Sequence, residues 1–294
     1  MPAARSIGII AVIAAAILWG TTGTIQTLLP EGKEPIIVGA MRIIIGALTL
    51  IMLAMLSAKT RNSFRLLPLR PILLAGLGIA VYNIAFFIGV LNSGVGIGTA
   101  ITVGSAPIWV TLYEIVIKRQ FPHLTRIIGQ TVSIIGALLL VLAGGARSGS
   151  VVGFGFAALA GAAYAAYSII TSQIGPRAPS VTTAAATFSV ASLFVLPVFL
   201  FLPVAWMTGG TVWLPLLFLG VVSTGVSYVL YTWGLNHVAA STAVTLALAE
   251  PLTAWVLAIF VVGENVSAVQ LFGAIMLMVG LAIVTAFPAK PKTE

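Results

Sequence analysis

Ten apolar runs of about 20 residues, separated by short polar breaks, constrain the fold of this sequence more than any other feature. A helix needs about 20 apolar residues to cross the hydrocarbon core of a membrane. The runs cover residues 7–29, 35–57, 68–91, 97–118, 124–143, 151–172, 180–203, 212–234, 239–262 and 266–287. Only 7% of the 294 residues are charged, against about a quarter in soluble domains. The sequence therefore predicts an all-α polytopic membrane protein with ten transmembrane helices, the first of which is a helix rather than a signal peptide.

The basic residues predict how these helices are oriented, because Lys and Arg concentrate on the cytoplasmic side of membrane proteins. With a cytoplasmic amino terminus, the inner segments carry Arg5, Lys59, Arg61, Arg65, Arg70, Lys118, Arg119, Arg126, Arg177, Lys290 and Lys292. The outer segments then carry only Lys33 and Arg147, while Arg42 lies within the second run. Both termini are therefore predicted to be cytoplasmic. The net charge of +8 is explained by this bias, so the lipid bilayer is the expected partner and nucleic acid is not.

The chain divides into two halves of five runs each, predicted as domains over residues 1–145 and 146–294. A shift of 144 residues brings Pro107 onto Pro251, Asn92 onto Asn236 and Gly136 onto Gly280. Because five is odd, the second half enters the membrane from the opposite side. Inverted repeats of this kind are common in secondary transporters, where they surround a site near the bilayer midplane. We therefore expect a central cavity between the two repeats. Gene duplication alone would also produce a repeat.

Three segments resemble the paired EamA domains of the drug/metabolite transporter superfamily. They are VGAMRIIIGALTLIML (38–53), LNHVAASTAVTLALAEPLTAWVLAIFVVGENVSAVQLFGAIMLMVGLAIV (235–284) and a weaker copy of the latter, LNSGVGIGTAITVGSAPIWVTLYEIVIKRQFPHLTRIIGQTVSIIGALLLV (91–141). The resemblance extends over nearly the whole chain and implies a multi-pass exporter of amino acids and related metabolites in a bacterial inner membrane. Within the superfamily, the aromatic content of the spans is most similar to YddG-type aromatic amino-acid exporters.

The most specific parts of the resemblance are Arg42 in the second span, Glu250–Pro251 in the ninth and Gly263–Glu264 before the tenth. The first repeat departs from this pattern, since Ala106–Pro107 and Arg119–Gln120 stand where the second has Glu-Pro and Gly-Glu.

Glu250 is the charged residue whose position is hardest to explain in a purely structural protein. A charge at the middle of a span costs at least a few kcal/mol, so Glu250 should face the protein interior. It could couple transport to protons or balance a substrate amine, or it could be a structural ion-pair or hydrogen-bond partner. Arg42 is the candidate partner, although the sequence does not show whether the two spans touch. Glu114, with Lys118 four residues later, is expected to form a surface pair near the cytoplasmic end of its span.

Pro107 and Pro251 occupy matching positions in the two repeats and are predicted to kink their helices. Proline removes one backbone hydrogen bond and crowds the carbonyl four residues earlier. The carbonyls of Val103 and Ala247 should therefore be free, which a membrane tolerates only against protein or a wet cavity. A packed structural kink is the alternative.

Polar and aromatic side chains at helical spacing predict the lining of a binding site. Such groups need partners at depth in a membrane, so they should face a shared interior. The candidate substrate-binding residues are Trp19, Thr22, Tyr82, Asn83, Thr102, Tyr164, Tyr167, Tyr228 and Tyr231. Rings and hydroxyls suit amphipathic solutes. Hydrogen bonding between helices is the alternative explanation for part of this set.

The fifth and tenth spans lack such a stripe and carry the glycine pairs Gly129/Gly136 and Gly273/Gly280. Small residues on one face permit close helix packing, so these spans are expected to be scaffold or the surface of a homodimer.

An enzyme is not expected, because the sequence offers no cysteine and places no His or Asp beside Glu250 within the spans. No cofactor or metal is expected either. The predicted function is export of small amphipathic metabolites, aromatic amino acids included, by alternating access. Transport of cationic drugs, sugar phosphates or nucleotide sugars is the alternative.

Overall fold

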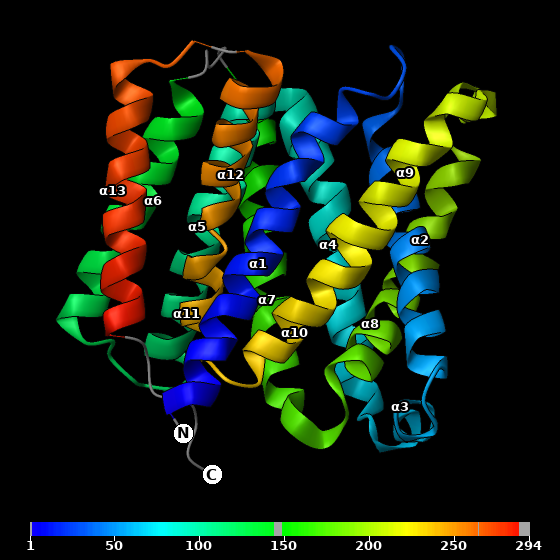
Figure 1. The fold of residues 1–294 in the computed structure, drawn as a ribbon, viewed down its shortest axis with the longest axis horizontal. Helices are drawn as coiled ribbons and strands as arrows, with labels where there is room; N and C mark the ends of the chain where they lie inside the picture. Colours follow the sequence, from blue (N-terminus) through cyan, green and yellow to red (C-terminus); the bar gives the residue numbers. More distant parts are fainter. Residues whose placement is uncertain (1, 144–148, 264, 288–294) are drawn as a thin grey trace.

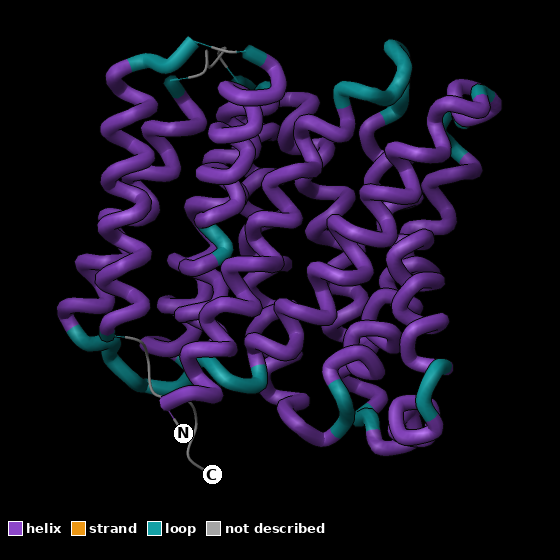
Figure 2. Tube along the Cα trace, in the orientation of Figure 1, coloured by secondary structure: helices purple, strands orange, loops and turns teal. Residues whose placement is uncertain are grey.

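The computed structural model describes residues 2–143, 149–263 and 265–287, and this part of the chain is helical without strands (Figures 1 and 2). It contains ten helical segments long and apolar enough to cross a membrane, which confirms the predicted fold class. The α-helices are α1 (Pro2–Gln26), α2 (Pro35–Met55), α3 (Ala58–Asn62), α4 (Leu69–Ser93), α5 (Val95–Val116), α6 (Leu124–Leu142), α7 (Val151–Ile174), α8 (Ser180–Val195), α9 (Trp213–Gly220), α10 (Ser227–Leu235), α11 (Ala240–Leu246), α12 (Ala249–Leu257) and α13 (Ala268–Ala286).

Shorter turns and two π-helical segments complete these spans. The 3₁₀ turns are η1 (Ser63–Leu66), η2 (Gly175–Arg177), η3 (Leu196–Leu200), η4 (Ala205–Thr208) and η5 (Gly210–Val212), and the π-helices are η6 (Val221–Val226) and η7 (Ala258–Val262). Four charged residues used in the sequence predictions lie outside the described residues: Arg147, Glu264, Lys290 and Lys292. The predicted domain boundary at 145/146 falls there too.

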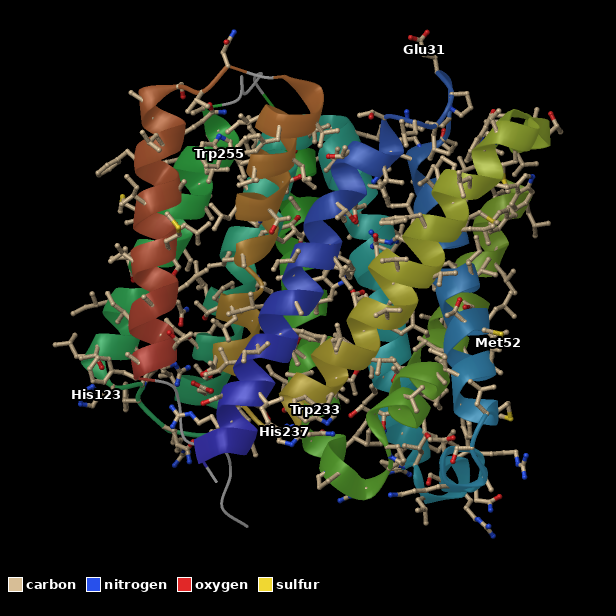
Figure 3. All side chains as sticks on the ribbon, viewed as in Figure 1. Glu31, Met52, His123, Trp233, His237 and Trp255 are labelled. Atoms are coloured by element: carbon tan, nitrogen blue, oxygen red, sulfur yellow. The ribbon has the colours of Figure 1, made fainter. Side chains whose placement is uncertain are left out.

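The two repeats run in opposite directions through the bundle. Helix α1 begins and α13 ends at the same end of the molecule, which we call the amino-terminal end (Figure 1). The segments that carry His123 and His237 also lie at this end, whereas Glu31 lies at the opposite end, which we call the far end (Figure 3). Thus the first repeat starts at the amino-terminal end and finishes at the far end, and the second repeat does the reverse.

Helix contacts follow the same inverted symmetry. Helix α7 packs on α4 and α5, and α1, its counterpart, packs on α10 and α12. Helices α2 and α8 are counterparts that pack on each other, as do α6 and α13. The first helix of each repeat is therefore inserted into the other repeat, so the core is built from both halves together.

The glycines of the fifth and tenth spans lie inside the contact between α6 and α13. A Cβ atom at Gly273 would lie only 2.9 Å from the carbonyl oxygen of Gly136, and one at Gly280 would press on Ser133. The absence of side chains thus lets the two backbones approach closely. These glycine faces are used within the chain, so a homodimer through the same spans would have to use their opposite faces.

The two prolines lie in different local structure, and the matching kinks stay a prediction. Helix α5 continues through Pro107 as one element. At Pro251 the span is interrupted, because α11 ends at Leu246 and α12 begins at Ala249, and Figure 2 shows the break as a short loop within the bundle. The carbonyl of Ala247 is not free as expected, since it accepts a 2.9 Å hydrogen bond from the Glu250 amide.

Candidate substrate site

A cavity lies between the two repeats, where spans from both halves contribute side chains. It is lined by Trp19, Arg42, Tyr82, Thr102, Val103, Ala106, Tyr164, Tyr228, Val244, Ala247 and Glu250. The space open to the centre of a water molecule is about 30 Å³, which is enough for roughly two waters. The surrounding side chains must therefore move apart before a larger solute can enter.

Four aromatic rings form one wall of this cavity. The ring centre of Trp19 lies 5.0 Å from that of Tyr228 and 6.1 Å from that of Tyr164, and Tyr82 lies 5.7 Å from Tyr164. These separations fall within the range in which aromatic rings attract one another. The four residues come from α1, α4, α7 and α10, so the wall combines both repeats. We call these four rings the aromatic wall.

Helix irregularity places part of this wall. Helix α10 begins directly after the π-helical turn η6, where the Thr224 hydroxyl donates 2.9 Å to the carbonyl of Leu219, five residues earlier. A π-turn inserts an extra residue into the helical repeat and so rotates the next stretch of helix about its axis. Tyr228 is the second residue of α10, so its direction depends on this turn. Such turns occur often at functional sites.

Tyr167 and Tyr231 belong to a second layer of rings rather than to the lining. Both are fully buried, and their ring centres lie 6.3 Å apart. The hydroxyl of Tyr231 is 2.9 Å from that of Ser168, and its ring lies 5.1 Å from Trp19. These two tyrosines therefore support the aromatic wall from behind, whereas the sequence placed them among the substrate contacts.

Thr22 and Asn83 also lie outside the lining of the cavity. Asn83 is buried against α2, where a Cβ atom at Gly39 would lie 2.6 Å from its side-chain oxygen. Thr102 is the threonine among the candidates that does line the cavity, and its hydroxyl donates a 3.0 Å hydrogen bond to the carbonyl of Ala157. Its position is therefore fixed by a contact between α5 and α7.

Arg42 and Glu250 both line the cavity, so the two spans that carry them meet there. No ion pair within 4.0 Å joins them in the described part of the chain. The Nε atom of Arg42 is buried and has no hydrogen-bond partner there. Glu250 lies in the first turn of α12, where the partial positive charge of a helix start favours an anion. Both groups are thus positioned beside a space in which a ligand could pair with them.

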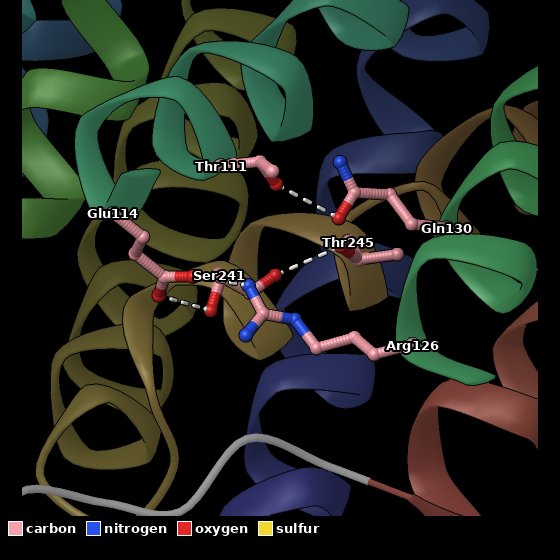
Figure 4. Close-up of polar contacts among 6 residues, drawn as sticks. All are labelled: Thr111, Glu114, Arg126, Gln130, Ser241 and Thr245. Carbon is pink, nitrogen blue, oxygen red and sulfur yellow. Dashed lines mark hydrogen bonds and ion pairs between the residues drawn. The ribbon is translucent and has the colours of Figure 1, made fainter. Parts of the chain in front are cut away.

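Glu114 is not the surface residue that the sequence predicted. Its carboxylate is buried, pairs with the guanidinium of Arg126 on α6 and accepts a 2.7 Å hydrogen bond from Ser241 on α11 (Figure 4). Lys118, its expected partner, instead lies over the ring of Tyr113, with Nζ 5.4 Å from the ring centre. The sequence contains one signal for this pair. The break between the fourth and fifth spans is short, so it returns Arg126 to the end of the fourth span, where Glu114 lies.

The described residues contain no group of three or more His, Asp or Glu side chains that could hold a metal ion. The two histidines make local contacts instead: the Nδ1 atom of His123 is 2.9 Å from the Thr125 hydroxyl, and that of His237 is 2.8 Å from the carbonyl of Trp233.

The two halves match known proteins separately and together. Residues 6–142 and 151–286 each match the EamA-like transporter family. The chain belongs to this family. It is 34% identical over 282 residues to the uncharacterized transporter YwfM of Bacillus subtilis, which covers 96% of this chain and 95% of that protein. An uncharacterized transporter of Archaeoglobus fulgidus is 26% identical over 212 residues, 70% of this chain and 74% of its own length.

A solved crystal structure shares the fold of this EamA-like protein. It covers 96% of the chain and 97% of its own, with a TM-score of 0.83 and 18% sequence identity. The chain is therefore a multi-pass membrane transporter and not an enzyme, and the resemblance to the drug/metabolite transporter superfamily is confirmed.

Proposed function

We propose that this EamA-like protein is a secondary transporter that exports amino acids, aromatic ones included, from the cytoplasm of a bacterium. The observation that carries the proposal is the composition of the cavity. A cation, Arg42, and an anion, Glu250, share a narrow space with the aromatic wall. An α-amino acid with a ring presents the complementary groups: one carboxylate, one ammonium and one apolar or aromatic face.

The pairing of charges gives the site its selectivity in this proposal. The substrate carboxylate accepts hydrogen bonds from the Arg42 guanidinium, and its ammonium donates to the Glu250 carboxylate. Charge-assisted hydrogen bonds are about twice as strong as neutral ones, and a buried charge without a partner is costly. The rings of the wall then contact the substrate side chain and the ammonium by stacking and cation–π attraction.

Alternating access is supported by the inverted contacts between the repeats. Each repeat has its first helix packed into the other repeat. Two inverted halves of this kind can exchange conformations, so that the cavity opens to one side of the membrane and then to the other. The break between α11 and α12 contains the lining residue Ala247 and provides a place for the span to bend. The bias of Lys and Arg supports an inner-membrane location with the amino-terminal end in the cytoplasm.

Proton coupling through Glu250 is part of the proposal. A carboxylate that binds either a proton or the substrate ammonium would exchange one for the other across the membrane. Uptake into proteoliposomes with and without a pH gradient tests this, using Glu250→Gln, which keeps the size of the side chain. A variant that responds to the gradient as strongly as the wild type would exclude the coupling role.

The substrate proposal is tested by competition in counterflow, in which unlabelled tryptophan inside proteoliposomes drives uptake of labelled tryptophan. Phenylalanine and leucine are expected to compete, whereas sugar phosphates are not. Tyr82→Ala should weaken tryptophan uptake, while Tyr113→Ala, at a ring outside the cavity lining, serves as the control. Strong competition by organic cations without any by amino acids would instead favour drug export.

A further inference from the structure

We propose that the hydrogen bond between Glu114 and Ser241 is a latch that closes the amino-terminal end of the cavity. This inference rests on alternating access as part of the proposed function, but not on the identity of the substrate. Val244 lines the cavity, and Ser241 lies one helical turn from it toward the amino-terminal end of α11. Glu114 lies about two turns beyond the lining residue Ala106 on α5. The bond therefore joins α5 and α11 directly between the cavity and the amino-terminal end.

The latch is well built for a buried contact. The Ser241 hydroxyl donates to Oε1 of Glu114 at 2.7 Å, while Arg126 donates to Oε2. Ser241 is 1% exposed, and the side chains of Arg126 and Glu114 are 8% and 12% exposed. A hydrogen bond to a charged acceptor is stronger than one between neutral groups. Arg126 is a positioning residue here, because it balances the carboxylate charge and fixes its direction.

Among the six described residues drawn in Figure 4, the hydrogen bond from Ser241 to Glu114 is the one that joins the two repeats. Glu114 and Arg126 belong to the first repeat, as do Thr111 and Gln130, whose side chains are joined by a 3.1 Å hydrogen bond nearby (Figure 4). Ser241 belongs to the second repeat. If α5 and α11 separate at the amino-terminal end to admit substrate, the bond from Ser241 must break while the other two can remain. This difference makes Thr111 a matched control for Ser241.

The latch has no counterpart at the far end among the matching positions. The shift of 144 residues places Ala258 opposite Glu114 and Ile97 opposite Ser241, and neither side chain can form a hydrogen bond. Gln270, opposite Arg126, is used in the capping box of α13 with Ser267. The two ends are thus held with unequal strength, and the latch favours the state that is closed toward the amino-terminal end.

The chain has no cysteine, so an introduced cysteine reports on access to the cavity without further changes. With Val103→Cys as the reporter, a membrane-impermeant thiol reagent is added to inverted vesicles, which expose the amino-terminal end. Ser241→Ala is expected to raise the labelling rate by about tenfold, the lower end of the range for losing one hydrogen bond to a charged group. Thr111→Val should leave the rate within about twofold of the reporter alone, and Ser241→Thr, which keeps the hydroxyl, should stay close to it as well.

An equal rate in Ser241→Ala and the reporter alone would overturn the latch, and so would an equal rise in Thr111→Val. Labelling of right-side-out vesicles should fall in Ser241→Ala, because fewer molecules are then in the state that is closed at the amino-terminal end and open at the far end. A failure of the substrate proposal would leave these rates unchanged, because the measurement needs no substrate.

Discussion

Removing the cation of the cavity should abolish the preference for amino acids over amines. The change is Arg42→Gln, and the two ligands are tryptophan and tryptamine, which lacks the carboxylate. Wild-type protein should bind tryptophan more tightly, because its carboxylate pairs with Arg42. In Arg42→Gln the two ligands should compete about equally well.

The size of the effect depends on the surroundings of Arg42. Its Nε donor has no partner in the described part of the chain, and the cavity holds only about two waters. A bound carboxylate would therefore exchange water for the guanidinium. A hydrogen bond to a charged group contributes about 1.5–3 kcal/mol, which corresponds to roughly 10- to 150-fold in affinity. This range is the expected ratio of tryptamine to tryptophan half-inhibition concentrations in the wild type.

Counterflow competition in proteoliposomes measures both ratios, and the comparison between them separates recognition from folding. If Arg42 serves only to stabilise the bundle, its loss weakens the binding of tryptophan and of tryptamine by the same factor. The ratio of their half-inhibition concentrations then does not change. That result, or a wild type without preference, would refute the proposed pairing. Glu250→Gln supplies the complementary case, because it should reduce the preference for tryptophan over indole-3-propionate, which lacks the ammonium.

Three further changes test the packing around the site. Gly280→Ala should destabilise the protein by about 1–3 kcal/mol, because the added methyl group overpacks α6 against α13. Its melting temperature in detergent should therefore fall. Gly155→Ala, which has open space beside it, should leave the melting temperature unchanged. Tyr231→Phe should cost about 1 kcal/mol of stability, because a buried hydrogen bond is lost. Tryptophan affinity in counterflow should stay nearly unchanged, since this ring lies behind the aromatic wall. A large loss of affinity would place the ring in the site. Pro251→Ala should lower the initial rate of uptake, because a continuous helix would replace the break between α11 and α12. An effect no larger than that of Pro107→Ala would show that this break is not a hinge.

The sequence predicts depth and helix face well, because both depend on the length and spacing of apolar residues. Trp19, Tyr82 and Glu250 are predicted to face inward on these grounds, and the structure brings them to one cavity. The sequence cannot distinguish a ring that faces the cavity from one that packs behind it. Tyr167 therefore has the same pattern as the lining residues although it is fully buried among other rings.

Partners distant in the sequence are harder to predict. Glu114 has a basic residue four positions away, so a local pair is the simplest explanation, but its contacts are 12 and 127 positions away. The two prolines illustrate the same limit. Both give the same signal in the sequence, but α5 continues through Pro107, whereas the span with Pro251 is interrupted between Leu246 and Ala249.

The central claim is that the cavity between the repeats holds the substrate and opens to either side of the membrane in turn. Labelling of Val103→Cys by an impermeant thiol reagent, applied separately to inverted and right-side-out vesicles, tests it most directly. The account predicts labelling from both sides and slower labelling from each when tryptophan is present. Labelling from one side only, or rates that tryptophan does not alter, would contradict it.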